Sequence, residues 1–223
     1  MAQNPQVLTR ALESTLATNS VIRNTYILLS LTLLFSALTA GVAMVTNAPM
    51  LNVWLVLGGY FGLLFVTHKL KNSAWGLLAV FALTGFMGYT LGPMLNAYIG
   101  HYTNGAQLVT YALGGTGVIF IGLSAYALTT RKDFSFMGGF LMAGILIAFL
   151  AGVANIFFAI PGLALAVSTM FMLLMCGLIL YETSSLIHGG ETNYILATIT
   201  LYVSIYNLFT SLLHILGVTS GDD

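Results

Sequence analysis

Long apolar runs, separated by short polar segments, dominate the pattern of this sequence. A helix needs about 20 mostly apolar residues to cross a membrane, and seven runs reach or approach that length. They cover residues 25–46, 51–68, 74–99, 107–129, 136–158, 162–187 and 194–217. Their continuous hydrophobicity favours helices over the shorter, alternating strands of a β-barrel. The pattern therefore predicts an all-α polytopic membrane protein, built as a bundle of seven transmembrane helices.

The same pattern divides the chain into an N-terminal tail, a membrane domain and a short C-terminus, at residues 1–24, 25–217 and 218–223. The tail is polar and has no apolar core followed by a small-residue cleavage site, so we expect no cleaved signal peptide. Asn4-Pro5 is typical of a helix start, and Leu8, Leu12 and Leu16 then fall on one face. Two interpretations stay open for the tail: a short helix lying at the membrane surface, or a mobile segment.

Composition supports the membrane assignment. Of the 223 residues, 58% are hydrophobic and 5% are charged, against about 25% charged in a typical soluble domain. The formal net charge is zero, which gives no indication of nucleic-acid binding. The single cysteine, Cys176, cannot form an internal disulfide, and no histidines and cysteines stand at metal-ligand spacing. We therefore expect an integral membrane protein without a cofactor.

The cationic residues are placed asymmetrically. All six lysines and arginines fall on one side of a seven-helix arrangement: Arg10, Arg23, Lys69, Lys71, Arg131 and Lys132. Lysine and arginine are enriched in the cytoplasmic connections of membrane proteins. The sequence therefore predicts a cytoplasmic N-terminus and, with an odd number of helices, a C-terminus on the opposite side. In a bacterium this corresponds to a multi-pass inner-membrane protein with a periplasmic C-terminus.

Glycine is abundant and partly spaced for close helix packing. Gly58 and Gly62 form one pair four residues apart, and Gly88 and Gly92 form another. Small residues at this spacing let two helix backbones approach each other within a membrane. We expect both pairs to lie at helix contacts.

Glu182 lies inside the sixth apolar run, about six residues from its end. A charged side chain in such a place costs about 2.5–3.5 kcal/mol near the membrane centre, and less toward the interface. Glu182 is therefore either an acid that responds to protons or cations, and a weak metal-ligand candidate, or it snorkels to the interface. In the second interpretation Lys69, Lys71 or Arg131 could reach it.

Polar residues form a stripe along the seventh run. Asn193, Ala197, Thr200, Ser204, Asn207, Ser211 and His214 recur at spacings of three and four, which places them on one helix face. Such a stripe should face the bundle interior or water. It serves either as interhelical hydrogen-bonding contacts or as the lining of a pathway. Thr200, Ser204 and Asn207 join Glu182 as candidates for sensing protons or ions.

Evidence for catalysis is weak. Gly122-Leu123-Ser124-Ala125 partly matches the Gly-x-Ser-Gly motif of intramembrane serine proteases, but the final glycine is missing. A serine nucleophile also needs a base within hydrogen-bond reach, and His188 and His214 stand near the ends of their runs. We expect that the protein is not an enzyme.

Three motifs resemble segments of the Bax inhibitor-1 family, also called transmembrane Bax-inhibitor-motif proteins. Tyr181-Glu182-Thr183 resembles the family's Tyr/Phe-Asp-Thr segment. Leu201-Tyr202-Val203-Ser204-Ile205-Tyr206-Asn207-Leu208-Phe209 is similar to its Leu-Tyr-Leu-Asp-Phe-Ile-Asn-Leu-Phe segment. Thr129-Thr130-Arg131-Lys132-Asp133-Phe134-Ser135 is similar to its Thr-x-Lys-x-Asp-Phe-Thr loop. Gly92-Pro93 also fits, and the resemblance covers residues 20–217.

Two further segments resemble the proteobacterial YccA-type branch of this family: Val21-Ile22-Arg23-Asn24-Thr25-Tyr26 and His188-Gly189-Gly190-Glu191-Thr192-Asn193-Tyr194. The resemblance implies a seven-helix fold with the last helix central. In channel-like members, two aspartates on the last two helices form a pH- and calcium-sensitive pair. Glu182 stands at the first of these positions and Ser204 at the second. One carboxylate opposite a hydroxyl loses the coupled titration of two acids and half the charge that attracts Ca²⁺.

The YccA-type branch is associated with the ATP-dependent membrane protease FtsH, both as a substrate and as a restraint on the enzyme. The resemblance thus implies a protein that binds and modulates this protease, with the cytoplasmic loop motif Arg131, Lys132 and Asp133 retained. The partner-engaging residues would lie in the tail: Pro5, Leu8, Arg10, Leu12, Glu13 and Leu16. The alternative is a pH-sensitive leak for Ca²⁺ or H⁺ with an incomplete acidic pair. The oligomeric state stays open.

Overall fold

The computed structural model describes residues 5–160 and 162–220, with side chains for residues 18–160 and 162–220. Its elements are α1 (Pro5–Val45), α2 (Val53–Leu70), α3 (Ala74–His101), α4 (Gly105–Thr130), the short 3-10 helix η1 (Ser135–Met137), α5 (Gly138–Phe158), α6 (Leu163–His188) and α7 (Tyr194–Ser220). All seven α-helices are long and apolar enough to cross a membrane, and the described part contains no strand. The predicted seven-helix bundle is confirmed.

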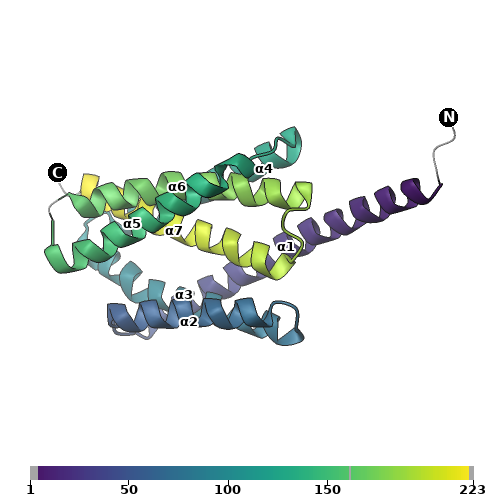
Figure 1. Cartoon of the computed structure of the whole chain (residues 1–223). Helices are drawn as coiled ribbons and strands as arrows, with labels where there is room; N and C mark the ends of the chain where they lie inside the picture. The colour runs from purple at the N-terminus through teal and green to yellow at the C-terminus, as the bar shows by residue number, and fades with distance from the viewer. Residues whose placement is uncertain (1–4, 161, 221–223) are drawn as a thin grey trace.

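The helix α1 is longer than the predicted first span. It runs without interruption for 41 residues because residues 6–40 contain neither glycine nor proline, the two residues that most disfavour a helix interior. Figure 1 shows that α1 extends well beyond the other helices. The prediction of a separate short helix in the tail is therefore wrong: tail and span form one helix. The tail candidates lie among residues whose side chains the structure does not describe: Pro5, Leu8, Arg10, Leu12, Glu13 and Leu16.

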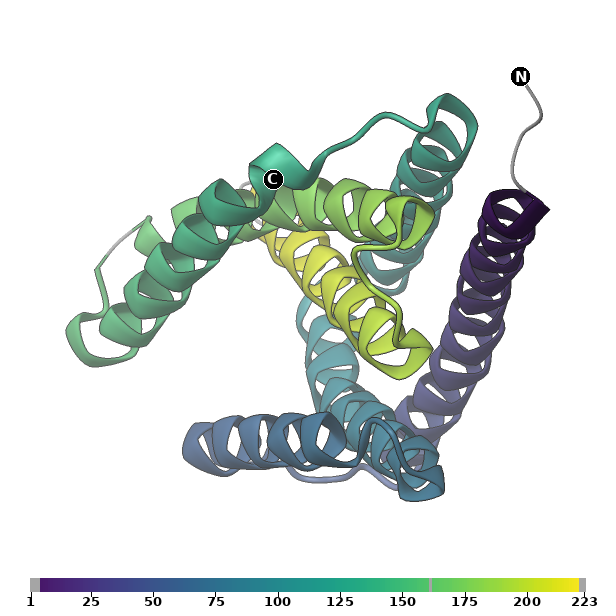
Figure 2. The same ribbon diagram turned by 45° about the vertical axis from the view of Figure 1, so that its right-hand side comes forward.

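The helix α7 lies at the centre of the bundle. It packs against α1, α3, α4 and α6, whereas α2 packs on α3 and α5 packs on α6. Figure 1 and Figure 2 show α7 between two groups, α1–α2–α3 on one side and α4–α5–α6 on the other. The central position expected from the family resemblance is confirmed.

One glycine pair forms the predicted close contact and the other does not. A Cβ atom at Gly88 would overlap the Ser36 carbonyl oxygen of α1, and one at Gly92 would lie 2.8 Å from the Ala40 carbonyl oxygen. At Gly58 and Gly62 an added Cβ would meet nothing within 4 Å. The prediction is wrong for this second pair because it lies on the exposed side of α2.

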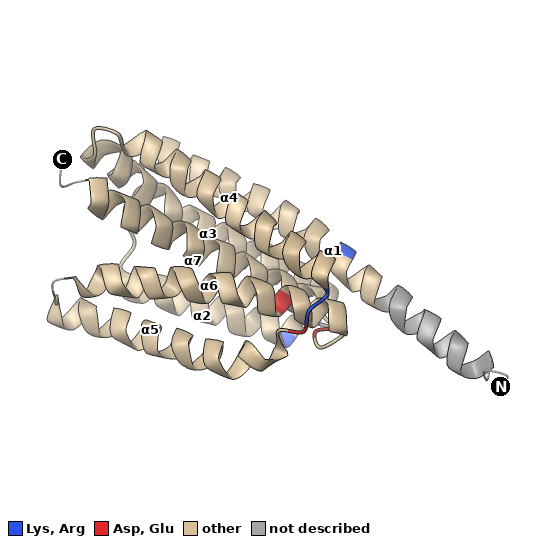
Figure 3. Cartoon of the chain, turned by 90° about the horizontal axis from the view of Figure 1, so that it is seen from above, with Lys and Arg blue, Asp and Glu red and all other residues tan. Residues whose placement is uncertain are grey.

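The described charged residues gather at one end of the bundle (Figure 3). Lys69, Lys71, Arg131 and Lys132 lie at the helix ends and loops of this side, and Arg23 lies within α1, near the start of its apolar stretch at Thr18. This arrangement agrees with the predicted one-sided distribution of lysine and arginine. That this end faces the cytoplasm stays a prediction from the preference of such residues for that side.

Candidate functional site

Glu182 is buried inside the bundle. Its side chain is 6% exposed, and its Oε1 atom has no hydrogen-bond partner among the described residues. The same part of the chain offers it no salt bridge to Lys69, Lys71 or Arg131. The structure therefore contradicts the snorkelling interpretation, because a snorkelling carboxylate would reach the interface. A buried carboxylate without a partner is costly and marks α6 as a candidate site.

Four helices meet near this carboxylate. The hydroxyl of Tyr26 on α1 shares a hydrogen bond of 3.3 Å with Thr183 Oγ1, next to Glu182 on α6. The Tyr26 ring also packs against Phe120 of α4, with ring centroids 6.3 Å apart. Thr198 Oγ1 of α7 donates to the carbonyl oxygen of Thr25, the residue before Tyr26 on α1, at 3.3 Å. The site is thus a junction of α1, α4, α6 and α7.

Two more buried side-chain oxygens without a described partner belong to residues beside this junction. They are Thr25 Oγ1, adjacent to Tyr26, and Ser124 Oγ, one helical turn from Phe120. Most buried polar atoms in proteins have a hydrogen-bond partner. Each of these oxygens, like Glu182 Oε1, is thus buried with no hydrogen-bond partner among the described residues.

The middle of the α7 stripe is bonded within its own helix. Thr200 Oγ1 donates to the Leu196 carbonyl oxygen at 3.1 Å, and Ser204 Oγ donates to that of Thr200 at 2.7 Å. Asn207 Nδ2 similarly donates to the Val203 carbonyl oxygen at 2.8 Å. These bonds let polar side chains enter a membrane interior without partners on other helices. They do not support interhelical bonding as the role of these three residues.

The two ends of the stripe do bond to other elements. Asn193 Nδ2 donates to the Lys71 carbonyl oxygen at 3.1 Å and to Asn72 Oδ1 at 2.9 Å, both in the α2–α3 loop. His214 Nδ1 lies 2.9 Å from Ser168 Oγ of α6. Among the described residues of the stripe, His214 therefore bonds to another helix and Asn193 to a loop.

Ser204, which stands where the family has its second acid, is completely buried. Its only described hydrogen bond goes to its own helix, so none joins it to Glu182. At 1.5 Å per residue, Glu182 lies about 9 Å before the end of α6 and Ser204 about 15 Å after the start of α7. Ser204 therefore does not substitute for an acid by hydrogen bonding to Glu182.

The loop motif is fixed to α6 by Ser184, which sequence reasoning missed. Ser184 Oγ accepts the Phe134 backbone N–H at 2.9 Å and donates to the Lys132 carbonyl oxygen at 3.1 Å. A polar residue two positions after Glu182 was the signal that could have identified it. The loop before α5 is thereby held against the helix that carries Glu182.

Within this loop, Asp133 and Lys132 make local interactions. The backbone N–H of Ser135 donates to Asp133 Oδ1 at 2.8 Å. Hydrogen bonds from Ser135, first from its backbone and then from its side chain, lower the pKa of Asp133, and His188 adds a smaller effect in the same direction. Lys132 Nζ donates to Tyr126 Oη at 3.2 Å. Arg131 ends α4 in a left-handed conformation with φ 51°.

The connection between α6 and α7 is built for a sharp reversal. Gly189 ends α6 with a φ of 73°, which glycine adopts without steric cost. Glu191 Oε1 accepts the backbone N–H of Asn193 at 2.7 Å. Asn193 Oδ1 in turn accepts the N–H groups of Ile195 and Leu196, at 3.0 and 3.2 Å, as a helix N-cap does.

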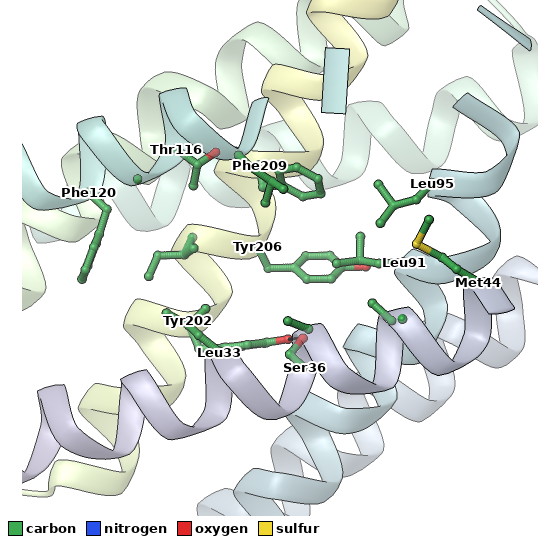
Figure 4. A pocket seen from close by; sticks show the side chains of 16 residues that line it. Leu33, Ser36, Met44, Leu91, Leu95, Thr116, Phe120, Tyr202, Tyr206 and Phe209 are labelled. Atoms are coloured by element: carbon green, nitrogen blue, oxygen red, sulfur yellow. Dashed lines mark hydrogen bonds between the residues drawn. The ribbon is translucent and has the colours of Figure 1, made fainter. Parts of the chain in front are cut away.

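A buried tyrosine cluster lies further along α7, at a cavity of about 390 Å³ between α1, α3, α4 and α7. Tyr202 Oη shares a 2.6 Å hydrogen bond with Ser36 Oγ of α1 and donates to the Thr84 carbonyl oxygen of α3 at 3.2 Å. Tyr206 Oη lies 3.3 Å from Thr90 Oγ1 of α3. Figure 4 shows Tyr202 and Ser36 side by side, with Tyr206 reaching across the cavity toward Leu91. Sequence reasoning missed this cluster, although the spacing of four between its two tyrosines was visible.

The weak serine-protease motif is not completed by a histidine among the described residues. Ser124 Oγ has no hydrogen-bond partner there. His188 Nδ1 instead lies 2.8 Å from the carbonyl oxygen of Ser184, and His214 pairs with Ser168. The described residues also contain no group of three or more histidine, cysteine and acidic side chains that could hold a metal ion.

Comparisons with known proteins match nearly the whole chain. Residues 18–221 match the family described as Inhibitor of apoptosis-promoting Bax1. The chain is 54% identical over 209 residues to "Modulator of FtsH protease YccA" of Escherichia coli K12, covering 94% of each protein. It is equally similar to "Inner membrane protein YccA" of Escherichia coli O6:H1. An uncharacterized protein of Pseudomonas aeruginosa is 57% identical over 205 residues, or 92% of each chain.

Proposed function

The chain belongs to the family of the Inhibitor of apoptosis-promoting Bax1, and from this membership we propose that it modulates an FtsH-type protease in the inner membrane. The observation that carries the proposal is the 54% identity, over 94% of both chains, to a protein named as a modulator of FtsH. In this proposal the protein acts by binding and restraining the protease rather than by catalysing a reaction.

The N-terminal part of α1 is the proposed point of engagement. Helix α1 begins at Pro5, whereas the stretch that qualifies as a membrane span begins at Thr18. In this proposal the preceding residues of α1 lie outside the membrane, on the side of the bundle where the described lysines and arginines gather. A polar chain end outside the membrane is the kind of segment that an unfolding motor engages. Engagement there makes the chain a substrate that also occupies the protease.

Deletion of residues 2–16 tests this mechanism while leaving the span from Thr18 intact. We expect the deletion to lengthen the half-life of the chain severalfold, and to restore turnover of a second FtsH substrate. Crosslinking to the protease in native membranes should fall at the same time. A control lacking residues 221–223, at the opposite end of the chain, should behave like wild type. If half-life, turnover and crosslinking are all unchanged by the tail deletion, the mechanism is wrong.

A second candidate, a cation or proton leak, is favoured by one observation. Glu182 is buried and its Oε1 atom has no described partner, as a proton- or cation-responsive acid requires. In liposomes containing the purified protein, Glu182→Gln should then remove Ca²⁺ or H⁺ flux. Ser204→Asp should create pH-sensitive flux by supplying a second acid. If liposomes with the wild-type protein show no more Ca²⁺ flux and no more H⁺ flux than empty liposomes, the leak is rejected. Protease modulation then remains as the proposed function.

A further inference from the structure

A crevice opens between α2 and α7 at the charged end of the bundle. This open crevice has a volume of about 530 Å³ and is lined by Phe61, Leu64, Phe65, His68, Leu196, Ile199 and Thr200. The two helices are not packed against each other, since α2 packs mainly on α3. Phe61, which lines the crevice, also contacts α5, with 5.7 Å between the ring centroids of Phe61 and Phe149. The crevice is therefore a defined space between helices.

The lining is mainly apolar, with His68 and Thr200 as its polar residues. His68 stands near the C-terminal end of α2, and Phe61 lies two turns before it. At 1.5 Å per residue, the lining on α2 extends about 10 Å from His68 to Phe61. Along this length the walls are aromatic and aliphatic apart from Thr200, whose hydroxyl donates to the Leu196 carbonyl oxygen of its own helix at 3.1 Å. Such a space excludes a hydrated ion but accepts a hydrocarbon chain, because apolar surface is best covered by apolar groups.

A cationic group stands at the rim. Lys69 Nζ lies 5.1 Å from the centroid of the Phe65 ring, which lines the crevice. Asn193 joins the α2–α3 loop beside Lys71 to the start of α7, which places a second cationic residue at this end. Glu191 of the same connection carries a negative charge and accepts the backbone N–H of Asn193 at 2.7 Å. Lys69 and Lys71 outnumber this acid, so the rim favours an anion.

We propose that this crevice binds one anionic glycerophospholipid, with its phosphate at Lys69 and His68 and an acyl chain along Phe61, Leu64 and Phe65. A basic rim above an apolar space between membrane helices suits a charged headgroup attached to a chain. The bilayer supplies this ligand at the depth where the crevice opens. A zwitterionic lipid offers the same chain without the net negative charge. The proposal does not depend on protease modulation.

The test is native mass spectrometry of the full-length protein in detergent, titrated with phosphatidylglycerol or with phosphatidylcholine. We expect one tightly held phosphatidylglycerol and weaker binding of phosphatidylcholine. Lys69→Gln should weaken phosphatidylglycerol binding about fivefold, the effect of one lysine near an anionic headgroup. Equal affinities for the two lipids would overturn the proposal.

A matched control separates a site from general surface charge. Lys132 also stands over an aromatic ring, 5.8 Å from the centroid of Tyr126, but it lies on the α4–α5 loop away from the crevice. Lys132→Gln removes the same charge and should leave lipid binding unchanged. If it weakens binding as much as Lys69→Gln does, the lipid is attracted by net charge alone and the site is rejected.

A third variant tests the crevice itself. Leu196→Trp should fill the space and reduce binding of both lipids, while Lys69→Gln affects only the anionic one. Thermal unfolding in the presence of phosphatidylglycerol gives an independent readout, because a ligand that binds the folded state raises the unfolding temperature. This stabilisation should be present in wild type and Lys132→Gln and smaller in Lys69→Gln. Full stabilisation of Leu196→Trp would show that the lipid binds elsewhere.

Discussion

Helices α7 and α2 are both membrane spans of nearly the same mean hydropathy, yet they occupy opposite environments. In the most apolar stretch of α7, 61% of the residues are buried inside the bundle, against 6% in α2. The difference comes from where the side chains find partners. Polar groups of α7 bond to its own carbonyl groups or to neighbouring helices, whereas α2 presents mainly Phe, Leu, Val and Gly outward. Hydropathy thus identifies a span but not its depth in the bundle.

The strongest test of this comparison is the same substitution on both helices. Gly217 of α7 is buried, and a Cβ there would lie 2.7 Å from Tyr98 Cε1 and 3.2 Å from Tyr102 Oη. Gly217→Leu should therefore lower the free energy of unfolding by about 2–3 kcal/mol through overpacking. Unfolding in mixed detergent micelles, followed by circular dichroism, measures the change.

Gly62→Leu on α2 is the matched control. No atom lies within 4 Å of a Cβ at Gly62, so we expect a change within about 0.5 kcal/mol. Similar destabilisation by both substitutions would mean that α2 is as tightly enclosed as α7. That outcome would contradict the contrast between a buried α7 and an exposed α2.

A second test removes one hydroxyl from each helix. Tyr202→Phe on α7 takes away the bonds to Ser36 Oγ and the Thr84 carbonyl oxygen in a fully buried position. We expect a loss of about 1–2 kcal/mol in unfolding free energy, because buried partners are left unsatisfied. Tyr60→Phe on α2, whose hydroxyl has no hydrogen bond with the described residues, should be nearly neutral. Equal losses would contradict the assignment of Tyr202 as a contact between α7, α1 and α3.

A third test concerns the polar stripe. Because the Ser204 hydroxyl bonds only to the Thr200 carbonyl oxygen of its own helix, Ser204→Ala should change the unfolding free energy by less than about 0.5 kcal/mol. The same detergent unfolding assay checks it. A loss well above that value would show that the hydroxyl contacts another helix, and would restore the interhelical interpretation for the middle of the stripe.

The smallest effect on stability is expected from a substitution at Asp133. This residue lies in a loop outside α2 and α7, so it gives a baseline for the substitutions in those helices. Its pKa lies below the ordinary aspartate value, chiefly because of the Ser135 backbone N–H. The charged form is therefore favoured in the folded protein. Its contribution to stability is complete above the ordinary pKa and is lost as pH falls through the lowered, folded-state value. Asp133→Asn should flatten this acid-side decrease in an unfolding series over pH.

Ser135→Ala is the control for this loop, since it keeps the backbone N–H that is the main cause of the shift. It should retain most of the pH dependence. If Asp133→Asn leaves the acid-side slope of wild type unchanged, the carboxylate does not contribute in the way its hydrogen bond indicates.

Much of the candidate site was predictable from single residues. Glu182 stood out because a carboxyl group in an apolar run is costly, and the structure places it in the interior. The partners around it were not predictable. Tyr26 of α1 is far in the sequence from Thr183 of α6 and Thr198 of α7, and no local pattern relates the three. Helical spacing found the α7 stripe, but the same spacing fits bonds within a helix and bonds between helices.

The glycine pairs and the tail also show what a sequence pattern cannot predict about packing and helix length. Gly58 and Gly62 match the spacing of Gly88 and Gly92, but only the second pair faces another backbone. Spacing defines a helix face, and the packing of the whole bundle decides whether that face meets a neighbour or lipid. In the tail, polarity indicated a boundary near residue 24, yet the helix continues through it. Polarity marks the edge of a membrane span, but a helix can continue past that edge where no glycine or proline interrupts it.

The sequence by itself determined the number of helices, their approximate limits, the one-sided placement of lysine and arginine, and the family. These are local properties, because about 20 apolar residues suffice to define a span wherever the chain later folds. The tertiary structure decided which helices surround α7, where the side chain of Glu182 lies, and that a space lined by Phe61 and Phe65 opens beside Lys69. Those features depend on how helices distant in sequence pack together, and hydropathy alone leaves that packing undetermined.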